Sequence, residues 1–125
     1  MDDRFELFVY GTLKRGDVRA PLLDGQRYLG PAKTAAAYRL FDTGDYPALV
    51  EARPLGLIGR SIGGELWAVD AACLDRLDVE EGVDEGLYAR RAIALIEPSG
   101  SALAYVYRRS VEGMADCGAS WRGME

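Results

Sequence analysis

Glycine and proline interrupt this sequence so often that long regular elements are disfavoured. The 125 residues include 15 glycines and five prolines, which divide the chain into many short segments. Short apolar or alternating segments between such residues are typical of β-strands. Strands and helices do not alternate regularly, which disfavours a doubly wound parallel sheet. We therefore predict an α+β fold, in which a small curled sheet or barrel of mixed strands carries short flanking helices.

Several segments have the composition or the alternation of short strands. The predicted strands cover residues 6–10, 34–41, 46–51, 62–69, 88–96 and 102–107. In the fourth of these, alternation places Ile62 and Leu66 on one face and Glu65 and Val69 on the other. Pro47 cannot donate a hydrogen bond to a neighbouring strand, so its strand is expected at a sheet edge.

Two short helices are predicted from their capping residues. Asp17 is suited to cap a brief helix over 17–24, and Asp70 is suited to cap a longer helix over 71–81. Gly82 directly follows the longer helix, a position where the backbone often turns left-handed.

The chain is expected to form one domain over residues 1–125, because this length leaves no room for a second core. No repeat or linker divides it. From about residue 110 onward the sequence is small and polar apart from Trp121. We therefore expect a tail that is loosely attached or irregular.

Charge and hydropathy argue against several kinds of partner. With 20 acidic and 15 basic residues, the net charge is −5, so the basic footprint of a nucleic-acid-binding protein is absent. The apolar runs are far too short for a membrane span. The opening Met1-Asp2-Asp3 is acidic and has no apolar signal core after it. We therefore expect a cytoplasmic protein that binds neither nucleic acid nor membrane.

The absence of histidine limits the chemistry that this chain can perform. Ser-His-Asp and Cys-His nucleophile pairs are excluded, and so are zinc or iron sites built on histidine. Cys73 and Cys117 are too few for a four-cysteine metal site and too far apart for a redox CxxC motif. Proton transfer must therefore fall to Asp, Glu, Lys, Tyr or Cys.

The residues 8–16, with the sequence FVYGTLKRG, join a buried strand to a loop that contains glycine. Such a loop can expose backbone N–H groups as an anion-binding concavity, and Gly11 allows close approach of a ligand. The segment has neither the GK[ST] ending of a P-loop nor the pattern GxGxxG. Two interpretations stay open: a site for a carboxylate or oxyanion, or an ordinary turn with solvated Lys14 and Arg15.

Glu81 differs from the other acidic residues near the end of the predicted helix 71–81. At about 100° per residue from Leu74, Leu77 lies near roughly 300° and Glu81 near roughly 340°. Glu81 is therefore on the apolar stripe, whereas Glu80 is off it. Burial and the negative helix end should raise the pKa of Glu81 above its ordinary value of about 4.3. Such a group is a competent general base; the alternative is a frayed last turn with Glu81 in water.

Together these segments resemble the γ-glutamylcyclotransferase-like family, which includes plant avirulence-induced-gene-type proteins and bacterial YtfP-like proteins. The matching residues are 8–16, 64–67 with 69–70, 74–78, 81–83 with Gly86, Tyr88 and Arg90, and 120–122. The sequence YGTL at 10–13 is similar to the γ-glutamylamine cyclotransferase and YtfP-like branches. The sequence EGV at 81–83 is also similar to the classical γ-glutamyl-amino-acid branch.

The resemblance implies a small mixed β-barrel with helices around it and a cavity at one barrel end for a γ-glutamyl group. The family's catalytic glutamate falls on Glu81. Its substrate-binding loop falls on Tyr10, Gly11, Thr12 and Leu13. Tyr88 matches a family tyrosine, which either lines the pocket or packs across the sheet.

The resemblance also implies the reaction and its partner. A small γ-glutamyl substrate would cyclise to 5-oxoproline and release an amine or amino acid, and neither a metal ion nor an organic cofactor is implied. Two alternatives stay open. One is a non-catalytic barrel of the same fold that binds a small metabolite or a partner protein. The other is amide hydrolysis to glutamate.

Overall fold

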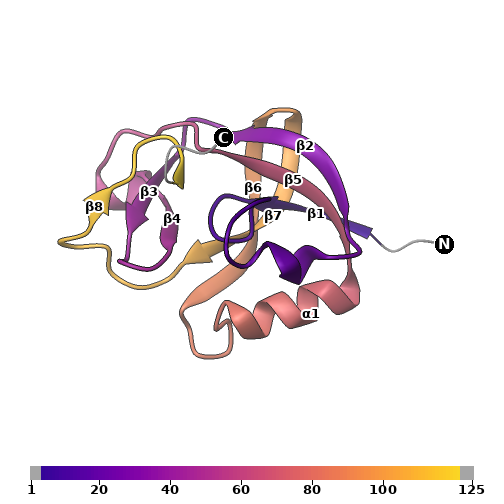
Figure 1. Cartoon of the computed structure of the whole chain (residues 1–125). Helices are drawn as coiled ribbons and strands as arrows, with labels where there is room; N and C mark the ends of the chain where they lie inside the picture. The colour runs from indigo at the N-terminus through magenta and orange to yellow at the C-terminus, as the bar shows by residue number, and fades with distance from the viewer. Residues whose placement is uncertain (1–3, 122–125) are drawn as a thin grey trace.

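The computed structural model of the chain describes residues 4–121. The acidic opening at 1–3 and residues 122–125, including Arg122 of the C-terminal motif, lie outside the described residues. Five strands form a closed barrel in the order β1-β5-β2-β6-β7 (Figure 1). Their bounds are β1 Arg4–Val9, β2 Arg27–Thr34, β5 Gly63–Asp70, β6 Tyr88–Glu97 and β7 Ser99–Tyr107.

The barrel is mixed because one pair of neighbouring strands is parallel. Antiparallel pairs join β1 to β5, β5 to β2, β2 to β6 and β6 to β7. The parallel pair is β7 with β1, which meet at Leu7 and Leu103 and close the barrel. Closure covers the free edges that so many short strands would otherwise expose. The predicted α+β fold, a small mixed barrel with flanking helices, is confirmed.

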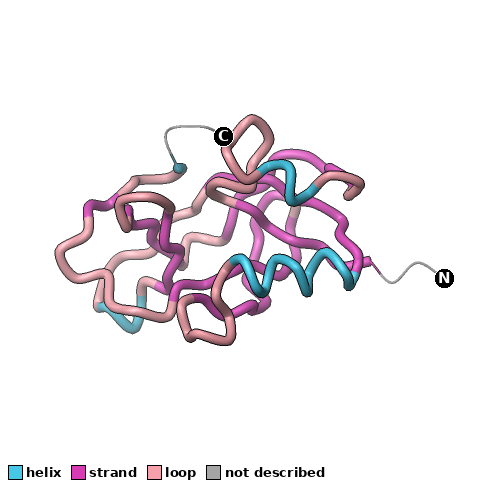
Figure 2. The backbone as a smooth tube through the Cα atoms, turned by 60° about the horizontal axis from the view of Figure 1, so that its bottom comes forward, coloured by secondary structure: helices cyan, strands magenta, loops and turns pink. Residues whose placement is uncertain are grey.

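The helix α1 (Ala71–Glu80) packs along one side of the barrel (Figures 1 and 2). Asp70 caps it as predicted, since its side chain accepts a hydrogen bond from the Cys73 amide at 2.8 Å. Cys73, Leu74 and Leu77 are the buried residues of this helix. They anchor α1 on the barrel, at a spacing of three to four residues that places them on one helix face.

The last part of β1 is apolar because it is buried on both faces. Leu7 and Val9 join the apolar cluster beneath α1, whereas Phe8 and the following Tyr10 join the larger cluster shared by the barrel strands. Successive side chains of a strand point to opposite faces, so this division follows from the pleat. β1 therefore leads into the next loop from a position fixed on both sides.

A three-stranded sheet lies beside the barrel, in the order β4-β3-β8 (Figure 1). Its strands are β3 Tyr38–Asp42, β4 Pro47–Glu51 and β8 Ala115–Asp116. β4 is an edge strand, as the proline at its start predicts. A short 3₁₀ helix, η2 (Arg53–Leu55), follows it.

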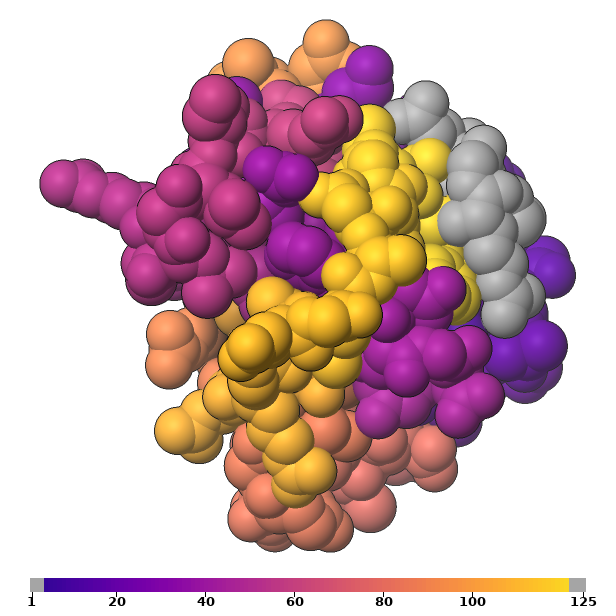
Figure 3. All heavy atoms as spheres, turned by 90° about the vertical axis from the view of Figure 1, so that its left-hand side faces the viewer, coloured from indigo at the N-terminus to yellow at the C-terminus, as the bar shows by residue number. Residues whose placement is uncertain are grey.

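The C-terminal segment is held more firmly than its composition predicts. The Cys117 amide donates to the Leu40 carbonyl at 2.8 Å, and the Gly63 amide donates to the Ala119 carbonyl at 2.7 Å. Trp121 is only 4% exposed and lies in the largest apolar cluster. Figure 3 shows the yellow segment laid along the surface between parts of the first half of the chain. The expected loose attachment is therefore not observed, because one buried indole and a few backbone bonds anchor a polar stretch.

The predicted helix over 17–24 is reduced to one short 3₁₀ helix, η1 (Ala20–Leu23). The Arg19 amide donates to the Thr12 carbonyl across the loop at 2.8 Å, so the backbone is tied to the end of β1 before η1 begins. No helix within residues 4–121 is long and apolar enough to span a membrane.

The strand β2 is missing from the predicted strands because Gly30 and Pro31 interrupt its pattern. β2 pairs with β5 over Arg27–Lys33, with a register shift between Tyr28 and Gly30, but with β6 only at its end. A proline without an amide donor is tolerated where one side of a strand is unpaired. The predicted strand 34–41 is in fact the end of β2, a bend and the start of β3.

Candidate active site

A pocket opens after β1, where the loop that follows this strand faces the end of α1. It has about 330 Å³ of empty space, including the part open to solvent. All six residues predicted for the site line this pocket, although they come from distant parts of the chain: Tyr10, Gly11, Thr12, Leu13, Glu81 and Tyr88.

A larger and more open groove lies elsewhere, with about 1270 Å³ of empty space including open solvent. Its wall combines apolar side chains such as Phe41 and Met114 with Arg91, Arg108 and Arg109. These arginines are exposed, so water screens them. The smaller pocket is the better candidate for chemistry because its charged groups are more deeply buried.

Glu81 is held in place by an ordered helix end. The Gly82 amide donates to the Val79 carbonyl at 3.1 Å, and the Val83 amide donates to the Asp78 carbonyl at 3.0 Å. These two bonds, with the positive φ of 64° at Gly82, form a Schellman motif. Glu81 is 6% exposed, so the alternative of a frayed turn with this side chain in water is wrong.

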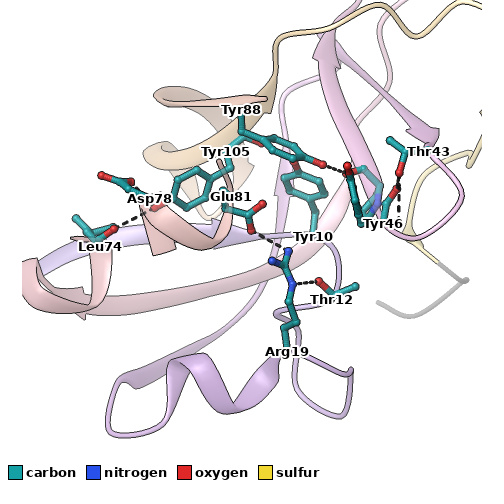
Figure 4. A network of polar contacts seen from close by, with 11 residues as sticks. Tyr10, Thr12, Arg19, Thr43, Tyr46, Leu74, Asp78, Glu81, Tyr88 and Tyr105 are labelled. Atoms are coloured by element: carbon teal, nitrogen blue, oxygen red, sulfur yellow. Dashed lines mark hydrogen bonds and ion pairs between the residues drawn. The ribbon is translucent and has the colours of Figure 1, made fainter. Parts of the chain in front are cut away.

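Glu81 is paired with an arginine that lies 62 residues earlier in the chain. Arg19 Nη2 donates to Glu81 Oε1 at 3.0 Å, and Arg19 Nε donates to the Thr12 hydroxyl at 2.6 Å (Figure 4). The Arg19 side chain is 29% exposed and that of Glu81 is 7% exposed. The guanidinium therefore lies between the carboxylate and the loop, on the more open side.

The pKa of Glu81 is raised above its ordinary value, as predicted. Burial is the main cause, because it penalises the ionised carboxylate. The Arg19 cation acts in the opposite direction and lowers the pKa, while the nearby Glu80 carboxylate raises it slightly further. The net result is a carboxyl group that holds its proton to a higher pH than an exposed glutamate and is a stronger base when ionised.

The tyrosines of the pocket present rings rather than reactive hydroxyls. The Tyr10 hydroxyl donates to the Tyr105 carbonyl, and the Tyr88 hydroxyl donates to the Pro47 carbonyl at 2.6 Å. Burial raises the pKa of both Tyr10 and Tyr88 well above the ordinary tyrosine value, so both stay neutral. Tyr88 also packs edge-on against Tyr107, with ring centroids 5.3 Å apart. Both alternatives for Tyr88 therefore apply, since it lines the pocket and packs in the core.

The loop after β1 offers backbone donors at the pocket. Within residues 4–121, the amide N–H groups of Gly11, Thr12 and Leu13 form no hydrogen bond with another protein group. Thr12 and Leu13 are each only 5% exposed. Buried amides are normally paired. These three are therefore available to hold the oxygen atoms of a ligand.

The interpretation of Lys14 as a solvated charge is wrong, whereas Arg15 is exposed to solvent as that interpretation expects. Lys14 is 2% exposed, and its Nζ donates to the Trp121 carbonyl at 3.4 Å. The Arg15 amide and Nε both donate to the Glu65 carboxylate, at 2.9 and 3.3 Å. The Arg15 guanidinium also lies over the Tyr28 ring, 3.7 Å from its centroid. Glu65 thus anchors the loop from the barrel side and does not line the pocket.

Arg19 is the charged pocket residue that sequence reasoning missed. The pairing of Arg19 with Glu81 joins residues 62 positions apart in the chain, so no local spacing reveals it. In the part of the chain that the structure describes, no three His, Cys, Asp or Glu side chains are grouped as metal ligands. Cys73 and Cys117 are free thiols, and neither lines the pocket.

The sequence of this chain matches a known protein family. The profile of the family described as "Gamma-glutamyl cyclotransferase, AIG2-like" matches residues 7–122. A Vibrio cholerae protein is 36% identical over 104 residues, which cover 83% of either chain. The gamma-glutamylcyclotransferase family protein YtfP of Escherichia coli K12 is 32% identical over 108 residues, covering 86% of this chain and 87% of that protein.

Solved structures show the same fold. A protein from uropathogenic E. coli, c4763, superposes with a TM-score of 0.80 at 24% identity, over 95% of this chain and 93% of that chain. A mouse AIG2-like protein superposes with a TM-score of 0.73 at 26% identity, over 94% and 88% of the two chains. The sequence and fold comparisons agree. The chain belongs to the AIG2-like gamma-glutamyl cyclotransferase family, among the YtfP-like proteins.

Proposed function

We propose that this chain is a γ-glutamyl cyclotransferase-type enzyme that converts a small γ-glutamyl amide to 5-oxoproline and a free amine or amino acid. Membership of the family supports the class of reaction. The observation that carries the assignment of roles is the buried carboxyl of Glu81, with its raised pKa, in a pocket whose loop amides have no protein acceptor.

The reaction is an internal transfer within the substrate. The α-amino nitrogen attacks the γ-carbonyl carbon, a C–N bond closes a five-membered ring, and an electron pair of the carbonyl moves onto its oxygen. When the C=O bond re-forms, the bond to the leaving nitrogen breaks. The attacking nitrogen loses a proton and the leaving nitrogen gains one, so the step needs no redox partner and no covalent enzyme intermediate.

Glu81 serves both proton transfers in this proposal. The ionised carboxylate accepts the proton of the attacking amine, and the resulting acid gives a proton to the leaving nitrogen. A raised pKa makes the ionised carboxylate a stronger base than that of an exposed glutamate, and the acid it forms can return the proton. Tyr10 and Tyr88 are not suited to this role, since burial keeps their hydroxyls protonated.

The loop and the tyrosines orient the substrate. The amides of Gly11, Thr12 and Leu13 donate to substrate oxygens, either the α-carboxylate or the oxyanion that develops on the γ-carbonyl. The rings of Tyr10 and Tyr88 line the pocket and limit the conformations of the glutamyl chain. Holding the amine against its own carbonyl lowers the barrier by proximity alone.

The proposed function is tested by incubating the protein with γ-glutamyl amines, γ-glutamyl amino acids and glutathione, and by quantifying 5-oxoproline and glutamate. We expect 5-oxoproline from at least one class of substrate. Glu81→Gln should keep the fold and reduce turnover by about a hundredfold to ten-thousandfold, as expected for a lost general acid/base. Glu80→Gln is the matched control, because Glu80 is exposed and does not line the pocket.

Three outcomes contradict the proposal in different ways. Release of glutamate in place of 5-oxoproline would show hydrolysis. Binding without turnover across the panel would favour the non-catalytic barrel. Full activity of a well-folded Glu81→Gln variant would remove the assignment of Glu81, even if the reaction itself were observed.

A further inference from the structure

We propose that Arg19 is the binding group for the α-carboxylate of the substrate, and that Arg19 and Glu81 together recognise an α-amino acid head group. This inference rests on the proposed function and adds to it the residue that recognises the free carboxylate on the carbon that carries the reacting amine.

Arg19 is the cationic side chain in the wall of the pocket. Two other cations of the same loop are engaged elsewhere. Lys14 Nζ donates to the Trp121 carbonyl, and Arg15 Nε lies 3.3 Å from Glu65. Neither Lys14 nor Arg15 lines the pocket. An anionic group that enters the pocket therefore meets Arg19.

The guanidinium keeps donors for such a group. Of the five N–H donors of an arginine, the Nε donor is directed to the Thr12 hydroxyl and one Nη2 donor to Glu81. Both Nη1 donors and the second Nη2 donor form no hydrogen bond within residues 4–121. Adjacent donors on the two Nη atoms match the two oxygens of a carboxylate. This two-bond arrangement is the strongest geometry for a guanidinium and a carboxylate.

The pairing of Arg19 with Glu81 matches the chemistry of an α-amino acid. In such a compound the ammonium and the carboxylate share one carbon, so the groups that bind them must also be adjacent. Arg19 Nη2 and Glu81 Oε1 are 3.0 Å apart, and both side chains line the pocket (Figure 4). A substrate whose carboxylate binds Arg19 therefore places its amine beside Glu81, the group proposed to remove its proton.

This assignment also divides the hydrogen-bond donors of the site between two groups of the substrate, the α-carboxylate and the γ-carbonyl. If Arg19 holds the α-carboxylate, the amides of Gly11, Thr12 and Leu13 serve the oxyanion that forms on the γ-carbonyl. Thr12 connects the two sets, because its hydroxyl accepts from Arg19 Nε while its own amide belongs to the loop. Thr12 is thus a positioning residue for Arg19.

The experiment measures kcat/KM for two substrates with the wild type, with Arg19→Met and with a control variant. N-butyl-γ-glutamylamide has the α-carboxylate, and N-butyl-4-aminobutanamide lacks only that group and would cyclise to 2-pyrrolidinone. Arg19→Met should lower kcat/KM for the first substrate by about thirtyfold or more, mainly through KM, as expected for a lost buried charge contact. For the second substrate the loss should be at least about tenfold smaller, because only the effect of Arg19 on Glu81 remains. Arg53→Met is the matched control and should affect neither substrate, because Arg53 is exposed and does not line the pocket.

An equal loss for both substrates in Arg19→Met would overturn the proposal, because Arg19 would then act only through Glu81. Arg19→Lys should recover part of the affinity for the carboxylate substrate, since it keeps the charge but not the paired donors.

A binding measurement keeps the inference testable if the reaction itself is not observed. In calorimetry, 5-oxoproline, which has a carboxylate, should bind wild type about tenfold or more tightly than 2-pyrrolidinone, and Arg19→Met should abolish this difference. A preference for 5-oxoproline that survives in Arg19→Met would refute the role of Arg19. Absence of turnover with a preserved, Arg19-dependent preference would refute only the proposed enzyme.

Discussion

Gly11 and Pro47 lie so close together that a β-carbon on Gly11 would be 2.5 Å from Cγ of Pro47. Gly11 is therefore required by the packing of the loop against β4, in addition to any close approach of a ligand. Pro47 also accepts the hydrogen bond of Tyr88 through its carbonyl oxygen. One contact thus connects the first loop with two other parts of the pocket wall.

This contact predicts a loss of function that a second change repairs. Gly11→Ala should lower kcat/KM by about tenfold or more, because the loop must shift away from Pro47. Pro47→Ala removes the Cγ and Cδ atoms that a new β-carbon would meet, so the double variant should recover much of the loss. Kinetics of 5-oxoproline formation in the two single variants and the double variant measure this coupling. Unchanged kinetics in Gly11→Ala, or additive losses in the double variant, would contradict the steric explanation.

The raised pKa of Glu81 predicts how stability depends on pH. The folded state binds this proton more tightly than the unfolded state, so the contribution of Glu81 to stability is fully present at low pH and is lost as pH rises through its folded pKa. Glu81→Gln has no proton to lose. It should therefore be more stable than wild type at neutral pH, and the two should converge in acid.

The difference in Tm between Glu81→Gln and wild type, followed by circular dichroism from about pH 4 to about pH 8, measures this effect. Other carboxyl groups titrate in both proteins and cancel in the difference. A wild type that is the more stable protein at neutral pH would mean that the ion pair with Arg19 outweighs burial, contrary to the direction given above.

Tyr88 should contribute through its ring more than through its hydroxyl. Tyr88→Phe leaves the Pro47 carbonyl without its donor, which should cost about 1–3 kcal/mol of unfolding free energy. The ring stays in place, so activity per folded molecule should remain within about threefold of wild type. Tyr88→Leu removes the ring and should lower kcat/KM further. Equal kinetics for the two variants would argue against a role for the ring in the pocket.

Trp121 should be a large source of stability despite its position near the end of the chain. Trp121→Ala should lower the free energy of unfolding by about 3–5 kcal/mol, the range for large buried aromatic residues. Urea denaturation measures this value. Val79→Ala is a suitable control, because Val79 is 76% exposed. A loss in Trp121→Ala no larger than that of the control would show that the C-terminal segment is only loosely attached after all.

The position of Glu81 could be predicted from the sequence because its cause is local. Leu74, Leu77 and Glu81 share one face of a helix by their spacing, and Gly82 marks its end. The strands with a clear apolar or alternating pattern were predictable for the same reason. The pocket residues on the loop came from the resemblance to a family, since a glycine after a strand is too common to identify a site.

What the sequence does not reveal depends on contacts between distant segments. The ion pair of Arg19 with Glu81 forms only when the barrel brings the loop to the helix end. The burial of Lys14 and Trp121 likewise requires the C-terminal segment to return to the barrel. β2 was not predicted because its glycine and proline interrupt the strand pattern. The strand accepts these residues because most of its length pairs with β5 alone.

The parallel junction of β1 and β7 at Leu7 and Leu103 has a consequence for motion. β1 has a long antiparallel ladder with β5 but meets β7 at this junction, directly before the loop at Tyr10. We expect amide protons beside the junction to exchange with deuterium sooner than those of the β6–β7 hairpin. A small molecule that contacts both the first loop and Glu81 would slow that exchange. Ligand binding at the site and local opening of the barrel should therefore be thermodynamically linked.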